Sequence, residues 1–203
     1  MSIQYVVEHL ATAVAAISGA LAGRGKQVDL FGVVVLAQVT ALGGGTLRDV
    51  ILDARPVFWV TDPSYIVTAT SAAIVLFVAV RYWRMPYKFL LFADAGALAL
   101  FTALGVHKAL ERGVSPIVAV AMGVMTGVVG GMVRDVLTGE IPFVLRHQIY
   151  LYATAAICGA SVFVVLSPYI DSSTVWGLAI ATTLLLRVAA ILWEIRLPLF
   201  QTK

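Results

Sequence analysis

One seven-residue pattern occurs twice in this chain and limits how it can fold. Gly-Gly-Thr-Leu-Arg-Asp-Val at 44–50 returns as Gly-Gly-Met-Val-Arg-Asp-Val at 130–136, so the two copies are 86 residues apart. Two flanking residues recur at the same separation: Thr40 as Thr126 and Pro56 as Pro142. Both copies lie in strongly apolar stretches, where paired glycines and an Arg-Asp dipeptide are the least expected residues. The chain is therefore predicted to be an internal duplication centred on these two segments.

Composition indicates that both segments lie in a membrane. The chain is 61% hydrophobic and 12% charged, with a mean hydropathy of +0.96, whereas a soluble domain is about half apolar and about a quarter charged. The net charge of +3 does not favour nucleic-acid binding, because the basic residues occupy short connections rather than a run or one face. The single cysteine, Cys158, excludes an intrachain disulfide.

Seven stretches have the length of membrane-spanning helices, each with about 20 mostly apolar residues. They predict an all-α membrane protein with spans at 4–23, 29–53, 62–82, 88–108, 114–138, 147–167 and 173–194. We expect one transmembrane domain over 1–203, with a first repeat at 4–84, a second at 88–167 and an additional helix at 173–194. Because each repeat holds three spans, the second copy enters the membrane in the opposite direction. Inverted repeats commonly enclose a binding site or pathway.

The charges of the connections predict the orientation, because basic residues favour the cytoplasmic side. One side receives Arg24, Lys26, Arg81, Arg84, Lys88, Arg146, Arg196 and Lys203, and the other receives Arg55, Lys108 and Arg112. The chain is therefore expected to have its N-terminus outside and its C-terminus in the cytoplasm.

The repeated element predicts an interruption in spans two and five, because glycine pairs weaken a helix. Carbonyls released near Gly43, Gly44, Gly45 and Gly130 can coordinate a cation, and Asp49 and Asp135 can supply negative potential. Arg48 and Arg134 oppose this unless the aspartates neutralise them. The predicted pore and kink residues are Gly43, Gly44, Gly45, Thr46, Thr126, Gly130 and Gly131. The predicted gate and ion-pair residues are Arg48, Asp49, Asp94, Arg134 and Asp135.

A structural alternative explains the same residues without a pathway. The glycines can be helix-packing contacts of the small-xxx-small kind, and each Arg-Asp can be a buried ion pair that locks two helices together. Intramembrane charges are costly and usually mark function, which favours a role in transport. Both interpretations can hold at once.

The remaining polar residues support smaller hypotheses. Asp94 lies about six residues into span four and is an expected partner for Arg134. Arg187 and Glu194 are expected to form a charge cluster at the cytoplasmic end of the last span. No histidines or cysteines have the spacing of metal ligands, and no nucleotide-binding or hydrolase signature is present. The sequence therefore predicts no enzyme activity, no metal and no cofactor, apart from permeant K⁺ or Na⁺ within a pore.

With its seven spans and doubled Gly-Gly-x-x-Arg-Asp element, nearly the whole chain resembles the prokaryotic branch of the trimeric intracellular cation (TRIC) channel family. The same duplicated unit is also known as the glycine transporter domain. The resemblance implies a homotrimer in which each subunit has its own pore, lined by helices kinked at the glycines and conducting monovalent cations, potassium above all. It places Arg48, Asp49, Arg134 and Asp135 around the gate. The expected partners are further copies of the chain, membrane lipids and cations, in the plasma (inner) membrane of a prokaryote, with no nucleic acid.

Two other functions remain open at this point. A secondary transporter for a small amino acid such as glycine can hold a carboxylate at helix N-termini, assisted by Arg48 or Arg134. A trimeric scaffold without transport is the third possibility. Flux measurements with potassium, sodium and glycine distinguish among them.

Overall fold

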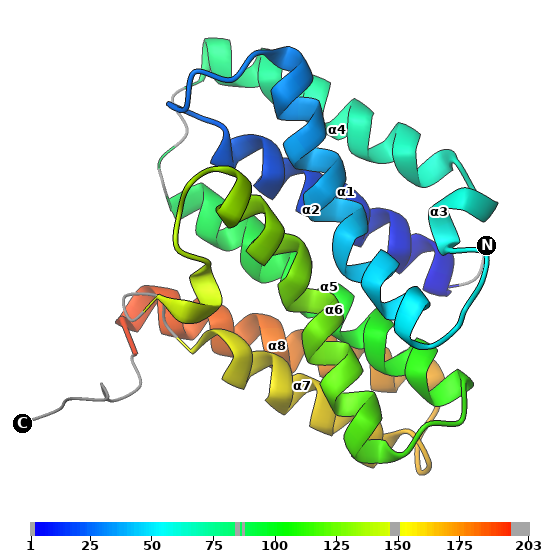
Figure 1. Ribbon diagram of the computed structural model, residues 1–203. Coiled ribbons are helices and arrows are strands. Elements are labelled where there is room, and N and C mark those ends of the chain that lie inside the picture. The colour runs from blue at the N-terminus through cyan, green and yellow to red at the C-terminus, as the bar shows by residue number, and fades with distance from the viewer. Residues whose placement is uncertain (1–2, 84–85, 87, 147–150, 196–203) are drawn as a thin grey trace, which may run out of the picture.

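The computed structural model describes residues 3–83, 86, 88–146 and 151–195, and the regular structure within these ranges is helical (Figure 1). Its elements are α1 (Ile3–Ala22), α2 (Leu30–Ile51), α3 (Phe58–Thr61), α4 (Ser64–Tyr82), α5 (Lys88–Glu111), α6 (Pro116–Leu137), the 3-10 turn η1 (Phe143–Leu145), α7 (Tyr152–Leu166) and α8 (Ser172–Trp193). An all-helical membrane protein was the fold class expected from the sequence.

Six of these helices, α1, α2, α4, α5, α6 and α8, are long and apolar enough to cross a membrane. The sixth of the seven predicted spans is not confirmed at full length, because the described helix there, α7, has 15 residues. At 1.5 Å per residue such a helix reaches about 22 Å, less than the roughly 30 Å of a bilayer core. The first four residues of the predicted span 147–167 lie outside the described residues.

The duplication is visible in the order and length of the helices. α2 and α6 both have 22 residues, and they begin and end 86 positions apart, at 30 and 116 and at 51 and 137. In the same order α5 corresponds to α1, η1 to α3 and α7 to α4. In Figure 1 each helix of the first unit runs opposite to its counterpart, with α2 and α6 side by side. The two units are therefore an inverted pair, and α8 follows them.

The C-terminal ends of α2 and α6 are built in the same way. After α2 the amide of Ala54 donates to the carbonyl of Asp49 at 2.8 Å, and after α6 the amide of Glu140 donates to the carbonyl of Asp135 at 2.8 Å. The residue before each donor, Asp53 or Gly139, has a positive φ of 48° or 71°. A left-handed residue lets the chain turn back and satisfy the last helical carbonyls. The repeated Arg-Asp dipeptides thus occupy equivalent positions in the last turn of each helix.

The glycines of the repeated element bring α2 and α6 into direct backbone contact. A Cβ built on Gly44 would meet the carbonyl oxygen of Thr126, and a Cβ built on Gly130 would meet the carbonyl oxygen of Thr40. Both helices remain α-helical at every residue of the motif. The predicted interruption at the glycine pairs is therefore corrected. An unbroken helix satisfies its own backbone inside lipid, and the absent side chains serve close packing instead.

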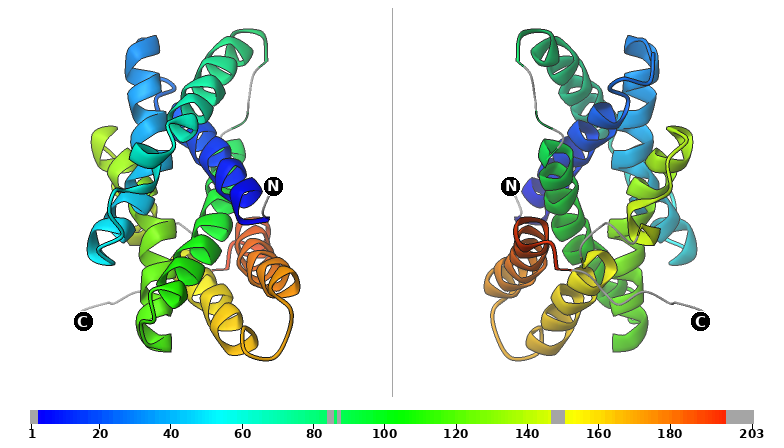
Figure 2. Two further views of the ribbon diagram at one scale, coloured as in Figure 1. Left: turned by 90° about the vertical axis from the view of Figure 1, so that its right-hand side faces the viewer. Right: turned by 90° about the vertical axis from the view of Figure 1, so that its left-hand side faces the viewer.

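The helices form two groups around this crossing. α1 packs on α2 and α4, while α5 packs on α6, α7 and α8. In Figure 2 α7 and α8 lie below α5, and α4 lies above α1. Gly19 of α1 and Gly105 of α5 occupy equivalent places: a Cβ on Gly19 would lie 2.6 Å from the Thr40 hydroxyl, and one on Gly105 would lie 2.6 Å from the Thr126 hydroxyl. The two central threonines are thus enclosed by small residues on both sides.

Replacing the contact glycines by alanine tests the reciprocal packing of α2 and α6. Gly44→Ala and Gly130→Ala are each expected to lower the free energy of unfolding by about 1–3 kcal/mol, because the new methyl group meets a backbone carbonyl that cannot turn away. Gly43→Ala is the matched control, since the nearest atom to its Cβ is the Gly130 Cα at 3.9 Å. Thermal unfolding in detergent measures all three variants. An equal loss of stability at position 43 contradicts the assignment.

Candidate functional site

A small cavity lies where α1, α2, α5 and α6 meet at the glycine crossing. Its volume is about 10 Å³, which is close to the space that one water molecule needs. It is lined by Ala15, Ser18, Thr40, Ala41, Gly44, Asp94, Ala97, Phe101, Thr126, Gly127, Gly130 and Gly131. We call this the central cavity. Among the predicted site residues, Gly44, Asp94, Thr126, Gly130 and Gly131 line it.

Arg134, in the last turn of α6, binds two residues that line the central cavity, Ser18 and Asp94. Its side chain is fully buried and forms ion pairs with Asp135 through Nε at 2.8 Å and with Asp94 of α5 through Nη1 at 2.8 Å. Nη1 also donates to the hydroxyl of Ser18 on α1. A side chain from the second repeat is therefore held by a residue of the first repeat, 116 positions away. The structure thus gives Arg134 the Asp94 partner that was expected from sequence.

Asp135 connects this cluster to the segment that follows α6. One of its oxygens accepts from Arg134, and the other accepts from the backbone amide of Phe143 at 2.8 Å. The Phe143 ring lies beneath the Arg134 guanidinium, with 4.7 Å between its centroid and Cζ. Such a cation–π contact adds to the ion pairs when water is excluded. We call Arg134, Asp135, Asp94 and Phe143 the second-repeat lock.

The first repeat contains an equivalent cluster at the opposite end of the molecule, which we call the first-repeat lock. Arg48 donates through Nε to Asp49 at 2.8 Å, and its Nη2 lies 2.7 Å from the same oxygen. The other oxygen of Asp49 accepts from the backbone amide of Phe58 at 2.9 Å, and the Arg48 guanidinium lies 5.7 Å from the Phe58 ring. Each Arg-Asp dipeptide therefore pins the short helical turn that follows its own helix.

A larger cavity, of about 520 Å³, lies at the end of the molecule where α6 ends, and we call it the vestibule. Its lining includes Asp135 and Phe143 of the second-repeat lock, together with Arg24, Lys26, Glu140 and Arg146. Arg134 binds Asp135, which lines the vestibule, and Ser18 and Asp94, which line the central cavity, so its side chain connects residues of the two cavities.

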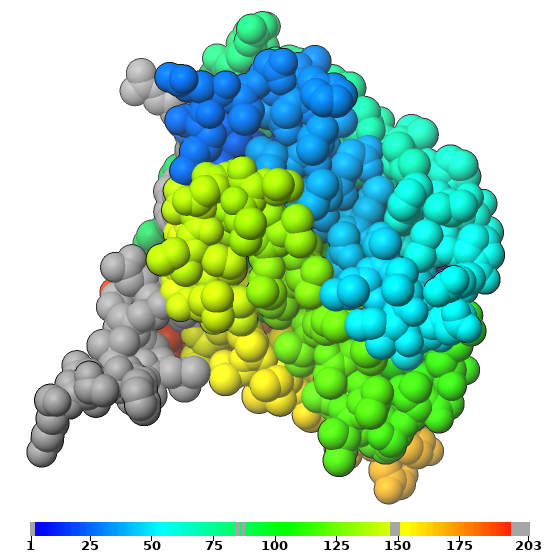
Figure 3. Space-filling model, in the orientation of Figure 1, coloured from blue at the N-terminus to red at the C-terminus, as the bar shows by residue number. Residues whose placement is uncertain are grey.

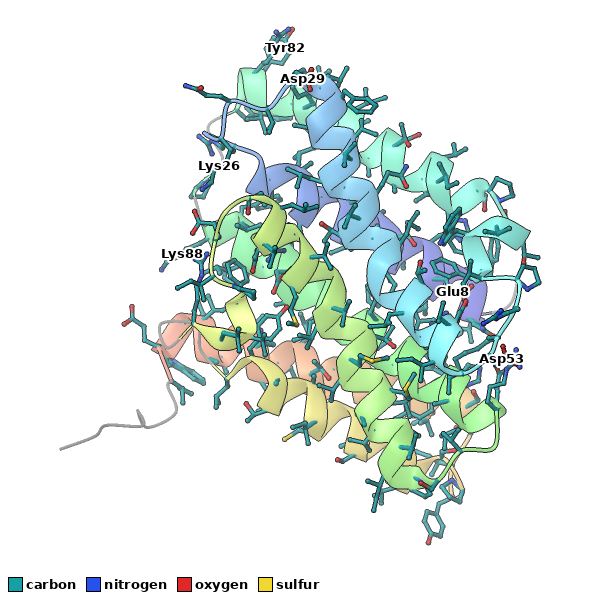
Figure 4. All side chains as sticks on the ribbon, in the orientation of Figure 1. Glu8, Lys26, Asp29, Asp53, Tyr82 and Lys88 are labelled. Atoms are coloured by element: carbon teal, nitrogen blue, oxygen red, sulfur yellow. The ribbon has the colours of Figure 1, made fainter. Side chains whose placement is uncertain are left out.

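A salt bridge between the repeats spans the vestibule. Lys26, in the connection after α1, lies 2.5 Å from Glu140, which follows α6. The hydrogen bond and charge of Lys26, with the charge of Arg146, lower the pKa of the Glu140 carboxyl. Because this folded-state pKa is depressed, the bridge persists at neutral pH and is lost as the pH falls through the lowered value. Figure 4 shows Lys26 and Lys88 at one end of the molecule and Asp53 at the other.

Three predicted site residues take supporting positions. Thr46 donates to the carbonyl of Leu42 and accepts from the indole of Trp59 at 2.9 Å. Gly45 makes room for the ring of Phe58, whose Cε1 would lie 2.7 Å from a Cβ at this position. Gly43 lies beside Gly130. Thr46 and Gly45 thus hold the turn after α2, whereas Gly43 belongs to the crossing of α2 and α6.

Arg187 was expected to form a charge cluster with Glu194 at the cytoplasmic end of the last span, and the structure buries it inside the protein. Its side chain is fully buried, with Nη2 3.8 Å from the second oxygen of Asp94 and the guanidinium 4.6 Å from the Tyr152 ring. Helix α8 thereby brings a second cation to the second-repeat lock.

The sequence did not indicate the role of Ser18, since one serine in an apolar helix gives little signal. Arg84, Arg196 and Lys203, which were used to predict the orientation, lie outside the described residues.

Among the residues that the structure describes, no three His, Cys, Asp or Glu side chains come together as a candidate metal site. The polar groups at the crossing are instead hydroxyls, carboxylates and guanidinium groups. In Figure 3 the surfaces of α2 and α6 meet along a continuous seam on the face that is shown.

Comparison with known proteins gives a consistent result. The family model described as "Glycine transporter" matches the chain twice, over residues 5–81 and 91–168. The UPF0126 inner membrane protein YadS of Escherichia coli (strain K12) is 45% identical over 201 residues, which cover 97% of this chain and 95% of that protein. A UPF0126 membrane protein of Vibrio cholerae is 43% identical over 201 residues, covering 98% of this chain and 83% of that protein.

Solved structures with the same fold are also similar in sequence. The TRIC trimeric intracellular cation channel orthologue from Rhodobacter sphaeroides matches with a TM-score of 0.90 and 36% identity, covering 96% of this chain and 100% of that chain. A second structure, which describes the basis for conductance through TRIC cation channels, matches with a TM-score of 0.88 and 32% identity over 100% of this chain and 99% of that chain.

Removing the Arg134 side chain tests the second-repeat lock. Arg134→Ala is expected to lower the free energy of unfolding by about 3–5 kcal/mol, because Asp94 and Asp135 keep their buried negative charges after losing the cation between them. Arg55→Ala is the control: its side chain is 74% exposed and pairs with Asp53, so the expected change is below about 1 kcal/mol. Thermal unfolding of both variants in one detergent measures the difference. Unchanged stability of Arg134→Ala contradicts the claim that the second-repeat lock stabilises the fold.

Proposed function

Because this chain belongs to the glycine transporter (TRIC-like) family, we propose that it is a cation channel whose ions pass along the crossing of α2 and α6. The observation that carries the proposal is the match to two TRIC channel structures over nearly the whole chain. The central cavity at this crossing supports the choice of pathway. The similar solved structures are channels and not enzymes, which agrees with the absence of catalytic signatures in the sequence.

The pathway begins in the vestibule and continues past Arg134 into the central cavity. There the hydroxyl oxygens of Thr40 and Thr126 replace part of the ion's hydration shell. Each hydroxyl donates its hydrogen to its own helix, Thr40 to Leu36 at 2.6 Å and Thr126 to Met122 at 2.6 Å, so its lone pairs remain available to a cation. Such weak neutral ligands allow an ion to bind and to leave again. This ligand chemistry suits potassium, the ion that we expect the channel to conduct.

We propose that the structure corresponds to a closed pathway in which Arg134 is the gate. The Arg134 guanidinium, held by Ser18 and Asp94, obstructs the way between the vestibule and the central cavity, and the central cavity holds about one water-sized particle. Opening requires the guanidinium to leave Ser18 and Asp94 while keeping its pair with Asp135. The lock and the pathway are then two functions of the same residues.

Assembly and orientation complete the proposal. The R. sphaeroides structure is a trimeric channel, which supports a homotrimer with one pore in each subunit. The chain is an integral membrane protein, and its E. coli relative is named an inner membrane protein, which supports the plasma membrane of a prokaryote. The vestibule, with Arg24, Lys26 and Arg146, faces the cytoplasm by the positive-inside rule.

Flux into liposomes that contain the purified protein tests the proposed function. We expect potassium and sodium to cross down their gradients without saturation at low concentration, and planar bilayers to show unitary cation-selective currents. Glycine is the discriminating substrate, because the family model carries that description. Saturable glycine uptake without unitary currents contradicts the channel function and indicates a transporter.

Replacing Ser18 tests the gate without removing the buried charges of Arg134 and Asp94. Ser18→Ala is expected to raise the open probability about fivefold, because the closed state loses one hydrogen bond worth about 1 kcal/mol. Thr182→Ala is the control, since this exposed hydroxyl binds only its own helix at Leu178 among the described residues. Single-channel recording measures both variants, and an unchanged open probability in Ser18→Ala excludes this gate.

A further inference from the structure

The two locks differ in the partners of one carboxylate, which occupies equivalent positions in the two repeats. Glu8 of α1 lies 86 positions before Asp94 of α5, so the two carboxylates occupy equivalent places in the two repeats. Asp94 faces two guanidinium groups, those of Arg134 at 2.8 Å and Arg187 at 3.8 Å. Glu8 instead accepts hydrogen bonds from neutral groups, the Tyr65 hydroxyl and the Gln4 amide at 3.1 Å.

The reason for the difference lies in two neighbouring positions. The serine that holds Arg134, Ser18, corresponds to Leu104 in the other repeat, which offers no oxygen to Arg48. Arg48 accordingly directs both its Nε and its Nη2 to one oxygen of Asp49. In addition, α8 packs on α5 and brings Arg187 to Asp94, whereas α1 receives no corresponding helix among the described elements.

The charges of the two clusters therefore do not match. In the second-repeat lock the two arginines balance Asp94 and Asp135. In the first-repeat lock Arg48 pairs with Asp49. Glu8 lines a cavity together with Arg48, so these three side chains carry one net negative charge. The ring of the next residue, His9, is bound to the Ser64 hydroxyl at 2.9 Å. A half-buried carboxylate such as Glu8 attracts a counter-ion when the protein does not supply one.

The space beside Glu8 fits a small ion. A cavity of about 10 Å³ is lined by Glu8, Thr12, Gly45, Arg48, Phe58, Tyr65, Phe101 and Leu104. The Thr12 hydroxyl donates to the Glu8 carbonyl at 2.8 Å and keeps its lone pairs. The Tyr65 hydroxyl donates to the Glu8 carboxylate and keeps lone pairs in the same way. One carboxylate and two hydroxyl oxygens are hard ligands of low total charge, which suit a monovalent cation better than a divalent one.

We propose that the Glu8 carboxylate, with the Thr12 and Tyr65 hydroxyls, binds a partly dehydrated monovalent cation in the cavity beside the first-repeat lock. The ion takes the place that the Arg134 guanidinium occupies beside Asp94 in the other repeat. Arg48 lines the same cavity, but Asp49 neutralises its charge. The inference rests on the proposed function, because it makes this site the outer end of the pathway, where ions that enter from outside first lose water.

Single-channel conductance of Glu8→Gln tests the site in a pore that conducts. At about 20 mM potassium, where screening is weak, inward unitary conductance is expected to fall about fivefold. At about 1 M potassium, where screening is strong, the difference is expected to disappear. The matched control is Glu111→Gln at the same end of the molecule, because Glu111 is 45% exposed and pairs with His107 and Lys108. An unchanged conductance in Glu8→Gln, or an equal fall in Glu111→Gln, overturns the proposal.

Thermal unfolding supplies a second readout that does not depend on conduction. At constant ionic strength, potassium is expected to raise the Tm of the unmodified protein relative to N-methylglucamine, and Glu8→Gln is expected to abolish that increase. If potassium stabilises through Glu8 in a protein that carries no current, the site stands and the channel function fails. If the protein conducts and Glu8→Gln keeps the full potassium effect, the function stands and the site fails.

Tyr65→Phe keeps the test decisive if Glu8→Gln does not fold. This variant retains the ring that packs on His9 and Phe58, and it removes only one of the three oxygen ligands. A smaller potassium-dependent rise in Tm than in the unmodified protein supports the site. An undiminished rise overturns it.

Discussion

The fold depends on two helices that approach each other closely enough for their backbones to touch. Gly44 rests on the carbonyl of Thr126 and Gly130 on the carbonyl of Thr40, so each repeat supplies both a glycine and an acceptor. Inside a bilayer the hydrophobic effect does not drive helices together, and close packing of small residues takes its place. The same closeness leaves only a water-sized space at the centre. Packing and a narrow pathway thus have one structural cause.

The buried ion pairs follow from where this crossing ends. Each Arg-Asp dipeptide lies in the last turn of its helix, at the negative end of the helix dipole, which favours a positive charge. Each aspartate then binds the backbone amide of the next helical turn, at Phe58 or Phe143. A charge in the membrane is costly unless it is paired and hydrogen-bonded. The pairs consequently fix the connections after α2 and α6, and through Ser18 one of them also joins the repeats.

Much of this arrangement is readable from sequence, and the exceptions have physical causes. Hydropathy predicts the long helices, and the pairing of Arg134 with Asp94 follows from their depth in facing spans. The glycine pairs suggest broken helices, yet α2 and α6 continue, because a glycine that packs on a neighbouring backbone need not unwind. The role of Ser18 depends on a contact across 116 positions, and the burial of Arg187 depends on where α8 packs. Neither leaves a local pattern in the chain.

Internal symmetry makes the differences between the repeats informative. Two clusters descended from one pattern should pair their charges alike, so a departure identifies a place where one half has changed. At Asp94 the chain provides two arginines, and at Glu8 it provides a tyrosine and a glutamine. One end of the proposed pathway is blocked by an arginine that is bound to Asp94. At the other end the described hydrogen bonds to the Glu8 carboxylate come from neutral groups, which favours capture of an ion there. The two ends of the proposed pathway therefore differ because of the few positions at which the two repeats differ.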